Sequence, residues 1–366
     1  MIKVLYIIST LKKTGPVNVL YNIIKNLDRT KYEPVILTLS KEPSGSIKSD
    51  FEKLGIKCHC LNVSGLKGYF EAGKIKKVVK EITPDIIHTH CFRSTLFTAL
   101  HLNKYKTLAT IHCDYDVDFV MAYGKFIGTL MSFIMDFSLK RINKRITVSE
   151  LLCNLLKKKK NYDLSFVNNG IDTEKFKPVK NKQELRNKLN LPVDKKIFVW
   201  AGVFIERKDP LLLVNTIKKL DNPNLFFVFC GNGKLLPAIK EETEGFKNVI
   251  FTGNVDNISE YLQASDFYIS TSLSEGLPMA VIEAMACGLP CLLSDIEQHK
   301  YVLKEQTGML FKSQNSSDLI HKINSILDID YELYSSCARQ TVLDNFSSEL
   351  MSEKYVRLYD LISKYI

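Results

Sequence analysis

Apolar strand-like runs alternate with amphipathic helical stretches along the whole chain, and this alternation restricts the possible folds more than any other feature. Such alternation is typical of parallel sheets whose strands are joined by crossover helices. The predicted strands of the first half are residues 4–9, 34–39, 57–61, 85–88, 107–111, 145–148 and 165–167. Those of the second half are residues 197–201, 225–230, 249–252, 267–270, 290–293 and 308–310. The sequence therefore predicts an α/β chain with two Rossmann-like sheets.

A polar, proline-broken segment at residues 176–182 separates the two halves. A chain of 366 residues is too long to fold around a single hydrophobic core, so two domains are expected. We place an N-terminal domain at residues 1–178 and a C-terminal domain at residues 179–346, with a last helix at 347–366 that could pack back on the first domain. Open parallel sheets bind ligands at the carboxyl ends of their strands, so a central cleft with one ligand on each side is expected.

The positive charge is concentrated in the first half. Residues 1–178 carry 29 Lys and Arg against 16 Asp and Glu, and the remainder carries 21 against 24. Such a basic half could bind nucleic acid, an anionic membrane or a phosphate-bearing substrate, or could simply be a solvated surface. Because no nucleic-acid-binding motif accompanies the charge, no nucleic-acid partner is predicted.

Two segments of the first half could lie on an anionic membrane. Residues 126–139 are rich in Phe, Met, Leu and Ile, and four lysines follow at residues 157–160. A core-facing helix and a solvated tail explain these segments equally well. No apolar run approaches the roughly 20 residues of a spanning helix, and the nine cysteines are scattered. We expect a cytoplasmic protein, with the inner face of the cytoplasmic membrane as a further possibility.

The sharpest chemical signal is the segment at residues 275–283, which follows a predicted strand and opens a helix. Pro278 suits a first helical turn, and the N–H groups of Met279 and its two successors would then point out of the helix start. Such an end binds phosphate or sugar oxygens. Glu275 before the helix and Glu283 inside it could reach different hydroxyls of one extended ligand. The alternative is an ordinary loop followed by a surface glutamate.

The Glu275-x7-Glu283 spacing, with Gly276 and Pro278 inside it, resembles the signature of the retaining family-4 glycosyltransferases, which have the GT-B fold. The resemblance extends over nearly the whole chain and implies an enzyme of the bacterial capsule, O-antigen or exopolysaccharide type. Further short motifs fall in the family's order at Gly15, residues 84–90, residues 110–112, residues 148–150, residues 169–172, Gly202 with Lys208, Gly231 with Gly233, and residues 265–266.

The resemblance assigns roles to individual residues. Lys208 would neutralise the departing pyrophosphate, Glu275 would contact the transferred sugar, and Glu283 would bind the ribose hydroxyls. His112, near the sugar and phosphate, completes the catalytic set, and His90 and Asp114 are candidates for acceptor contacts. The remaining donor-binding candidates are Gly15, Arg207, Gly231, Asn254, Val255, Gly276, Leu277, Pro278 and Met279.

Two positions depart from the family pattern. The family often has Arg directly after the glycine that matches Gly202, whereas this chain has Val203, and Arg207 is the candidate substitute. The glycine loop has a single glycine, Gly15, followed by Pro16, which removes one N–H that could have met phosphate.

Three patterns could indicate a metal, and we favour a structural explanation for each. Asp114 and Asp116 have the Asp-x-Asp spacing, but the phosphate-handling candidates lie about 90 residues later, so an acidic loop is the better interpretation. His88 and His90 face the same side of a strand, and residues 58–60 read Cys-His-Cys without a partner pair. We predict no metal, and no cofactor beyond the nucleotide-sugar co-substrate.

Together these expectations predict that the protein catalyses a metal-independent, retaining hexosyl transfer. The donor is a nucleoside-diphosphate sugar, by family frequency a UDP-sugar, and the acceptor is a hydroxyl of a glycan or an undecaprenyl-diphosphate-linked oligosaccharide. The alternatives are a nucleotide-sugar epimerase or a phosphorylase of the same fold, and a non-catalytic binding protein. A dinucleotide-dependent oxidoreductase is disfavoured because no Gly-x-Gly-x-x-Gly follows the first strand.

Overall fold

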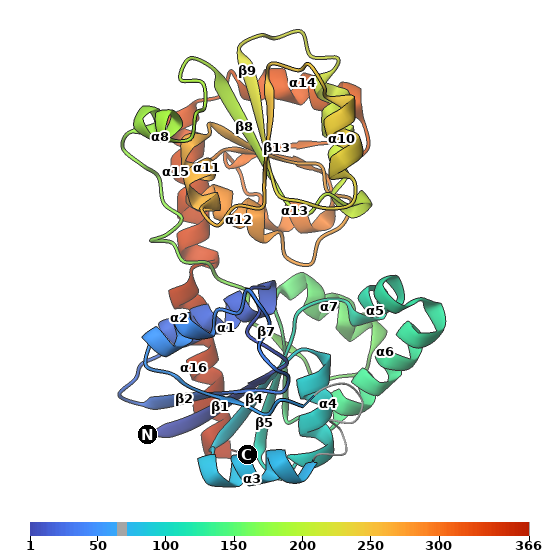
Figure 1. The fold of residues 1–366 in the computed structure, drawn as a ribbon, viewed down its shortest axis with the longest axis vertical. Coiled ribbons are helices and arrows are strands. Elements are labelled where there is room, and N and C mark those ends of the chain that lie inside the picture. Colours follow the sequence, from blue (N-terminus) through green and yellow to red (C-terminus); the bar gives the residue numbers. More distant parts are fainter. Residues whose placement is uncertain (64–71, 366) are drawn as a thin grey trace. The chain divides into compact units, whose positions relative to one another are not determined.

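The computed structural model describes residues 1–63 and 72–365 (Figure 1). The chain divides into two compact units: unit 1 is Met1–Gly170 with Ser348–Ile366, and unit 2 is Ile171–Ser347. The division thus lies eight residues before the boundary expected from the proline-broken segment. Residues 171–178 belong to unit 2 because Ile171 N–H donates to the Phe346 carbonyl, and Arg339 donates to the carbonyls of Thr173 and Phe176.

Unit 1 is built on a seven-stranded sheet with the order β3-β2-β1-β4-β5-β6-β7, all of whose pairings are parallel. The strands are β1 (Ile2–Ile8), β2 (Tyr32–Thr38), β3 (Lys57–Cys60), β4 (Ile86–His90), β5 (Lys106–Ile111), β6 (Lys144–Thr147) and β7 (Ser165–Phe166). The helices are α1 (Gly15–Lys25), α2 (Lys48–Lys53), α3 (Ala72–Ile82), α4 (Phe92–His101), α5 (Tyr115–Tyr123), α6 (Lys125–Lys140), α7 (Glu150–Lys159) and α16 (Ser348–Tyr365).

Unit 2 contains a six-stranded sheet with the order β10-β9-β8-β11-β12-β13, again with parallel pairings. The strands are β8 (Lys196–Ala201), β9 (Leu225–Cys230), β10 (Val249–Gly253), β11 (Phe267–Ser270), β12 (Cys291–Ser294) and β13 (Gly308–Phe311). The helices are α8 (Lys182–Lys188), η2 (Glu206–Lys208), α9 (Pro210–Ile217), α10 (Leu236–Glu242), α11 (Ile258–Ala264), α12 (Met279–Ala286), α13 (Glu297–Val302), α14 (Ser316–Ile326) and α15 (Tyr331–Asn345). The prediction of two Rossmann-like parallel sheets is confirmed.

Both faces of each sheet are buried, which explains why the strands read as continuous apolar runs. On β1, Val4 and Tyr6 join one core cluster with α1 and α16, whereas Leu5 and Ile7 join another with α3 and α4. Crossover helices on both faces therefore leave the strand ends as the places where polar side chains gather.

Helix α16 packs on β4 and α1 through a buried set of hydroxyl groups. The Tyr359 hydroxyl lies 3.0 Å from the Tyr6 hydroxyl and 2.8 Å from His88 Nδ1. The Tyr355 hydroxyl lies 3.0 Å from Thr110 Oγ1. The C-terminal helix thus returns to the N-terminal sheet, and it does so through specific polar contacts as well as apolar packing.

Tyr359→Phe tests this attachment. The substitution leaves His88 Nδ1 without its partner in a buried place, so we expect a loss of about 1–3 kcal/mol in the free energy of unfolding. Urea denaturation followed by circular dichroism measures it. Leu361→Ala is the control because Leu361 is exposed on the same helix and should change stability by no more than about 0.5 kcal/mol. Equal effects of the two substitutions would contradict a specific role for the hydroxyl.

Candidate functional site

In unit 2, the carboxylate of Glu275 is surrounded by donors from two loops. Lys208 Nζ donates to Glu275 Oε1 at 2.5 Å, and Ser272 Oγ donates to the same oxygen at 2.7 Å. Arg207 Nη1 lies 3.4 Å from Glu275 Oε2 and donates to the Ser274 carbonyl at 2.7 Å. Arg207 and Lys208 come from η2 after β8, whereas Glu275 comes from the loop after β11. The structure thus brings together three of the residues that the sequence singled out.

The two loops are fixed to each other by hydrogen bonds to backbone carbonyls. Thr271 Oγ1 donates to the carbonyls of Lys208 and Asp209 at 3.0 and 2.8 Å, and Leu273 N–H donates to the Arg207 carbonyl at 2.8 Å. Sequence reasoning missed Thr271 and Ser272. The sequence could have indicated both residues, because hydroxyl residues directly after an apolar strand are unusual in an otherwise buried run.

The charges around Glu275 keep its carboxyl ionised. Only 8% of this side chain is exposed, and burial alone would raise its pKa. The Lys208 ammonium, the hydrogen bonds from Lys208 and Ser272, and the charge of Arg207 outweigh burial and lower the pKa below its ordinary value. The cluster therefore holds two cations beside one fixed carboxylate, an arrangement that suits a ligand carrying both phosphates and hydroxyls.

Helix α12 begins one residue later than expected, because Pro278 is its N-cap and Met279 its first residue. The N–H of Met279 was predicted to be free, but it donates to the Leu277 carbonyl at 2.8 Å. A turn at Leu277 and Pro278 causes this difference. The next two N–H groups, on Ala280 and Val281, lie in the first turn, where no helical acceptor exists for them.

Glu283 differs from Glu275 in its surroundings. Its side chain is partly buried in α12, and no hydrogen bond or ion pair to it occurs among residues 1–63 and 72–365. Burial raises the pKa of the Glu283 carboxyl to about 7, an effect that Lys175 partly opposes. A carboxyl without a protein partner among the described residues is available to accept hydrogen bonds from ligand hydroxyls.

The glycine candidates of unit 2 permit close approach of the strand ends. A Cβ on Gly231, whose φ is +139°, would lie 1.8 Å from the Gly202 carbonyl oxygen, so no other residue fits there. Gly231 N–H donates to the Gly253 carbonyl at 2.8 Å, which brings the following residues, Asn254 and Val255, to the same edge. Val203 is half-exposed and makes no charged contact. Gly276 and Leu277 complete the loop before α12.

In unit 1, the buried His90 and the partly buried His112 form a pair at the ends of β4 and β5. His90 Nδ1 lies 3.0 Å from His112 Nε2, whereas His90 Nε2 is buried without a partner. Burial lowers the pKa of His112 to about 4 and that of His90 well below its usual value. Both rings are therefore neutral at pH 7. His88 has a structural role, because its two ring nitrogens bond to Tyr359 and Thr110.

The aspartates of the Asp-x-Asp motif are paired with lysines of α7 and its end. Asp114, the N-cap of α5, accepts from Lys159 Nζ at 2.5 Å, and Asp116 lies 3.1 Å from Lys160 Nζ. One carboxylate oxygen of Asp114 is buried without a partner. Lys159 and Lys160, which were considered as contacts to lipid head groups, are thus bound to carboxylates of their own unit. Gly15 is exposed at the start of α1.

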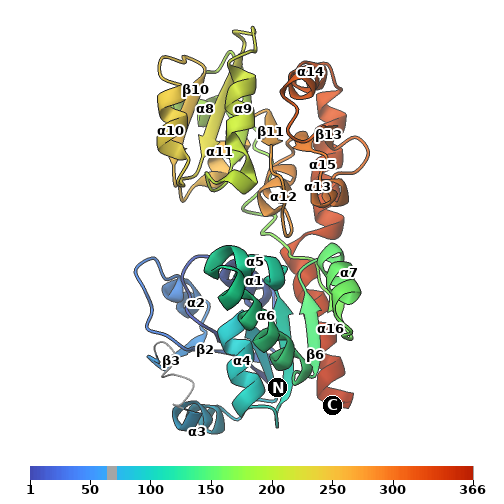
Figure 2. The same ribbon diagram turned by 90° about the vertical axis from the view of Figure 1, so that its right-hand side faces the viewer.

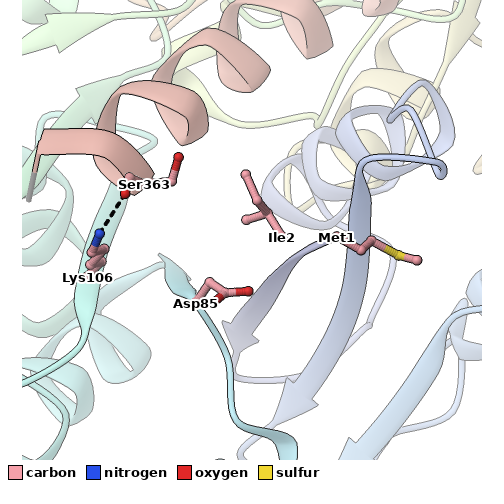
Figure 3. Close-up of a pocket in the computed structure, with 5 residues that line it drawn as sticks. All are labelled: Met1, Ile2, Asp85, Lys106 and Ser363. Atoms are coloured by element: carbon pink, nitrogen blue, oxygen red, sulfur yellow. Dashed lines mark hydrogen bonds between the residues drawn. The ribbon is translucent and has the colours of Figure 1, made fainter.

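A separate pocket lies at the amino-terminal ends of the unit 1 strands, opposite the ends that carry His90 and His112. It is lined by Met1, Ile2, Asp85, Lys106 and Ser363 (Figure 3). Asp85 and Lys106 lie at the amino-terminal ends of β4 and β5, and Lys106 Nζ donates to the Ser363 carbonyl at 2.7 Å. This pocket is distant along the strands from His90 and His112, and it contains none of the predicted site residues.

Family models match both units of the chain. Residues 14–175 match the model described as Glycosyltransferase Family 4, and residues 181–342 match the model described as Glycosyl transferases group 1. The chain belongs to the family-4 glycosyltransferases. The family matches give no support to the epimerase alternative, and the enzyme is a glycosyltransferase.

Curated relatives of this glycosyltransferase come from bacterial surface-polysaccharide synthesis. It is 25% identical over 320 residues to the Escherichia coli UDP-Gal:alpha-D-GlcNAc-diphosphoundecaprenol alpha-1,3-galactosyltransferase, covering 82% of this chain and 81% of that one. It is 27% identical to the Staphylococcus aureus capsular polysaccharide biosynthesis glycosyltransferase CapH, covering 82% and 84% of the two chains.

Solved structures of similar fold agree with the GT-B prediction. A glycosyltransferase from Rickettsia africae superposes with a TM-score of 0.83 at 21% identity and covers 100% of this chain and 99% of that one. Anabaena HepE in complex with UDP-glucose superposes with a TM-score of 0.82 at 15% identity, covering 99% of this chain and 100% of that one. The glycosyltransferase therefore has the GT-B fold.

Glu283→Gln should remove a loss of stability that the wild type shows as the pH rises. The carboxyl has a higher pKa in the folded protein than when unfolded, so the folded state binds more protons and stability falls as pH rises from about 4.5 to about 7. We expect the variant to be about 1–3 kcal/mol more stable than the wild type at about pH 8, and similar at about pH 4.5. Urea unfolding followed by fluorescence of Trp200, the single tryptophan, measures this in unit 2. A constant difference at all pH values would contradict the raised pKa.

Proposed function

We propose that the enzyme catalyses a metal-independent, retaining transfer from a UDP-sugar to a hydroxyl of an undecaprenyl-diphosphate-linked oligosaccharide in surface-polysaccharide synthesis. The observation that carries this proposal is the cluster of Lys208, Arg207 and Glu275 at the carboxyl edge of the unit 2 sheet. Relatives from E. coli and Campylobacter jejuni are named for diphosphoundecaprenol-linked acceptors. Anabaena HepE was solved with UDP-glucose, which supports the choice of UDP.

In this proposal the two cations of the cluster act on the leaving diphosphate. Negative charge develops on the phosphate as the bond to the sugar breaks, and Lys208 and Arg207 lie where they can neutralise it. A diphosphate bound there competes with Glu275 for the Lys208 ammonium. The carboxylate of Glu275 then accepts hydrogen bonds from sugar hydroxyls, and α12 presents the N–H groups of Ala280 and Val281 to oxygens of the same ligand.

The nucleoside would occupy the strand ends near Gly231, Asn254 and Val255, with its ribose hydroxyls on Glu283. The leaving phosphate takes the proton of the attacking hydroxyl, so attack occurs on the face from which the diphosphate departs. We assign the acceptor to unit 1, where the neutral rings of His90 and His112 can bind a hydroxyl without adding charge. Unit 1 carries 30 Lys and Arg against 17 Asp and Glu, which supports contact with an anionic lipid surface at the inner face of the membrane.

Lys208→Met tests the phosphate role. We expect transfer to fall about 100-fold or more because the charge on the leaving group loses its neutralising partner. The variant also leaves Glu275 with fewer counter-charges, so its stability should fall. Lys208→Met combined with Glu275→Gln removes both charges and should recover stability without recovering activity. UDP release in the presence of a polyprenyl-diphosphate-linked sugar is the measurement.

Lys188→Met is the matched control, because Lys188 pairs with Glu260 at 2.6 Å on the surface of unit 2 and should leave transfer unchanged. A stable double variant that transfers sugar at the wild-type rate would show that the cluster is structural.

A panel of nucleotides tests the donor. Thermal shifts with UDP, GDP and ADP should single out UDP, since a ligand at 100 times its Kd stabilises by about 2.7 kcal/mol. Glu283→Gln should weaken the shift with UDP because it changes the proposed ribose contact. A larger shift with GDP or ADP would overturn the UDP assignment. Incubation with a UDP-sugar alone separates the rival reaction, because an epimerase would convert the donor without any acceptor.

A further inference from the structure

Helix α6 buries one face of small and apolar residues and exposes a second face of large apolar residues. The residues buried against unit 1 are Gly128, Ser132, Met135, Ser138 and Leu139. The outward stripe follows at helical spacing and consists of Phe126, Leu130, Phe133 and Phe137, which are 86%, 53%, 70% and 40% exposed. The outward face of a water-facing helix is normally polar. The outward face of α6 is therefore apolar enough to require a partner.

Helix α5 adds to the same exposed apolar surface. Val117, Met121 and Tyr123 are exposed on α5, and Ile127 is exposed at the start of α6. The two helices are joined through Gly124 and pack closely at Gly128, where a Cβ would lie 2.5 Å from Val120 Cα. Figures 1 and 2 show the two helices side by side on the outside of unit 1. We call the outward face of this helix pair, from Val117 to Phe137, the α5–α6 face.

The charges around the α5–α6 face are mostly positive. Between Asp118 and Asp136 the only charged residue is Lys125, which is exposed at the tip. Asp136 is held by Lys160 Nζ at 2.8 Å, and the Arg141 guanidinium lies 4.1 Å from the ring centre of Phe137. Asp118, exposed beside Val117, is the one carboxylate of this face without an ion pair among the described residues, and the two cations outnumber it. An apolar face with an excess of cations at its rim is complementary to an anionic lipid surface.

We propose that the α5–α6 face inserts into the interfacial region of an anionic bilayer. The apolar side chains would enter the boundary between head groups and acyl chains, while Lys125 and Arg141 reach lipid phosphates. No helix among the described residues is long and apolar enough to cross a membrane.

A second copy of the chain fits this face less well. A symmetric dimer would bring Lys125 and Arg141 of both protomers into one apolar interface, in which Asp118 is the one carboxylate of each α5–α6 face left to pair with them. On a bilayer the same lysine has phosphates within reach of its flexible side chain. The charge pattern therefore favours lipid.

The α5–α6 face is close in sequence to the acceptor candidates. Helix α5 begins at Tyr115, three residues after His112 and one after Asp114. A bilayer bound here would hold a lipid-linked acceptor beside the strand ends of unit 1, so this role of the α5–α6 face rests on the proposed function. Membrane binding by the face can be measured without donor or acceptor, so a failure of one proposal can be distinguished from a failure of the other.

Co-sedimentation with vesicles tests the proposal. The wild type should bind vesicles of phosphatidylglycerol and phosphatidylethanolamine, and bind phosphatidylcholine vesicles more weakly. Phe126→Ser combined with Phe133→Ser should lower the partition coefficient about tenfold or more. Leu155→Ser, at an exposed apolar residue of α7 outside the α5–α6 face, should leave it unchanged. Equal binding by the wild type and the double variant would overturn the proposal.

A charge substitution separates the α5–α6 face from the lysine run at residues 157–160. Lys125→Glu should weaken binding to the anionic vesicles severalfold, whereas Lys158→Glu, at an exposed lysine of α7, should have a smaller effect. The reverse order would place the membrane contact on α7 and contradict the assignment.

Fluorescence and oligomeric state complete the test. Phe126→Trp should show a blue shift and quenching by brominated lipids, and Trp200 contributes little because it is buried in unit 2. If instead the Phe126→Ser and Phe133→Ser variant converts a dimer to a monomer in light scattering and leaves vesicle binding unchanged, the face is a contact between copies and the proposal fails.

Discussion

The ion pair between Lys208 and Glu275 is the interaction on which the proposed donor site of unit 2 depends. A buried carboxylate is costly unless its charge is matched, and here two cations and a hydroxyl match it from segments 68 residues or fewer apart. The same contacts fix the loop after β8 to the loop after β11. Charge placement and loop geometry are therefore determined together, before any ligand binds.

Much of this arrangement could be predicted from the sequence, because periodicity reports the strands and parallel strands end at a common edge. Arg207, predicted to substitute for a cation missing at Val203, lies 3.4 Å from Glu275, and its role toward phosphate stays a prediction. The hydrogen bond from Met279 N–H to the Leu277 carbonyl could not be predicted, since it depends on the backbone angles of Leu277 and Pro278. The order of strands and helices along a sequence does not determine the conformation of an individual turn.

Contacts between residues far apart in the chain were the other part that the sequence did not reveal. The attachment of His88 to Tyr359 joins residues 271 positions apart, and no local pattern indicates such a pairing. The lysines at 159 and 160 resembled a lipid-binding run, but their partners are the carboxylates of Asp114, Asp116 and Asp136. A charge run alone does not show which of its members are already paired.

Two carboxyl groups eight positions apart have opposite environments, and this contrast explains how one short segment can serve two purposes. Cations and a hydroxyl lower the pKa of Glu275, whereas burial without a protein partner raises the pKa of Glu283 to about 7. An ionised carboxylate suits a place beside a lysine and the diphosphate that we propose to bind there. A carboxyl that titrates near neutrality would repel that diphosphate less than a fully ionised one, and it can still exchange hydrogen bonds with a diol. Both environments follow from position, because Glu275 lies in a loop facing η2 and Glu283 lies on a helix packed into the core.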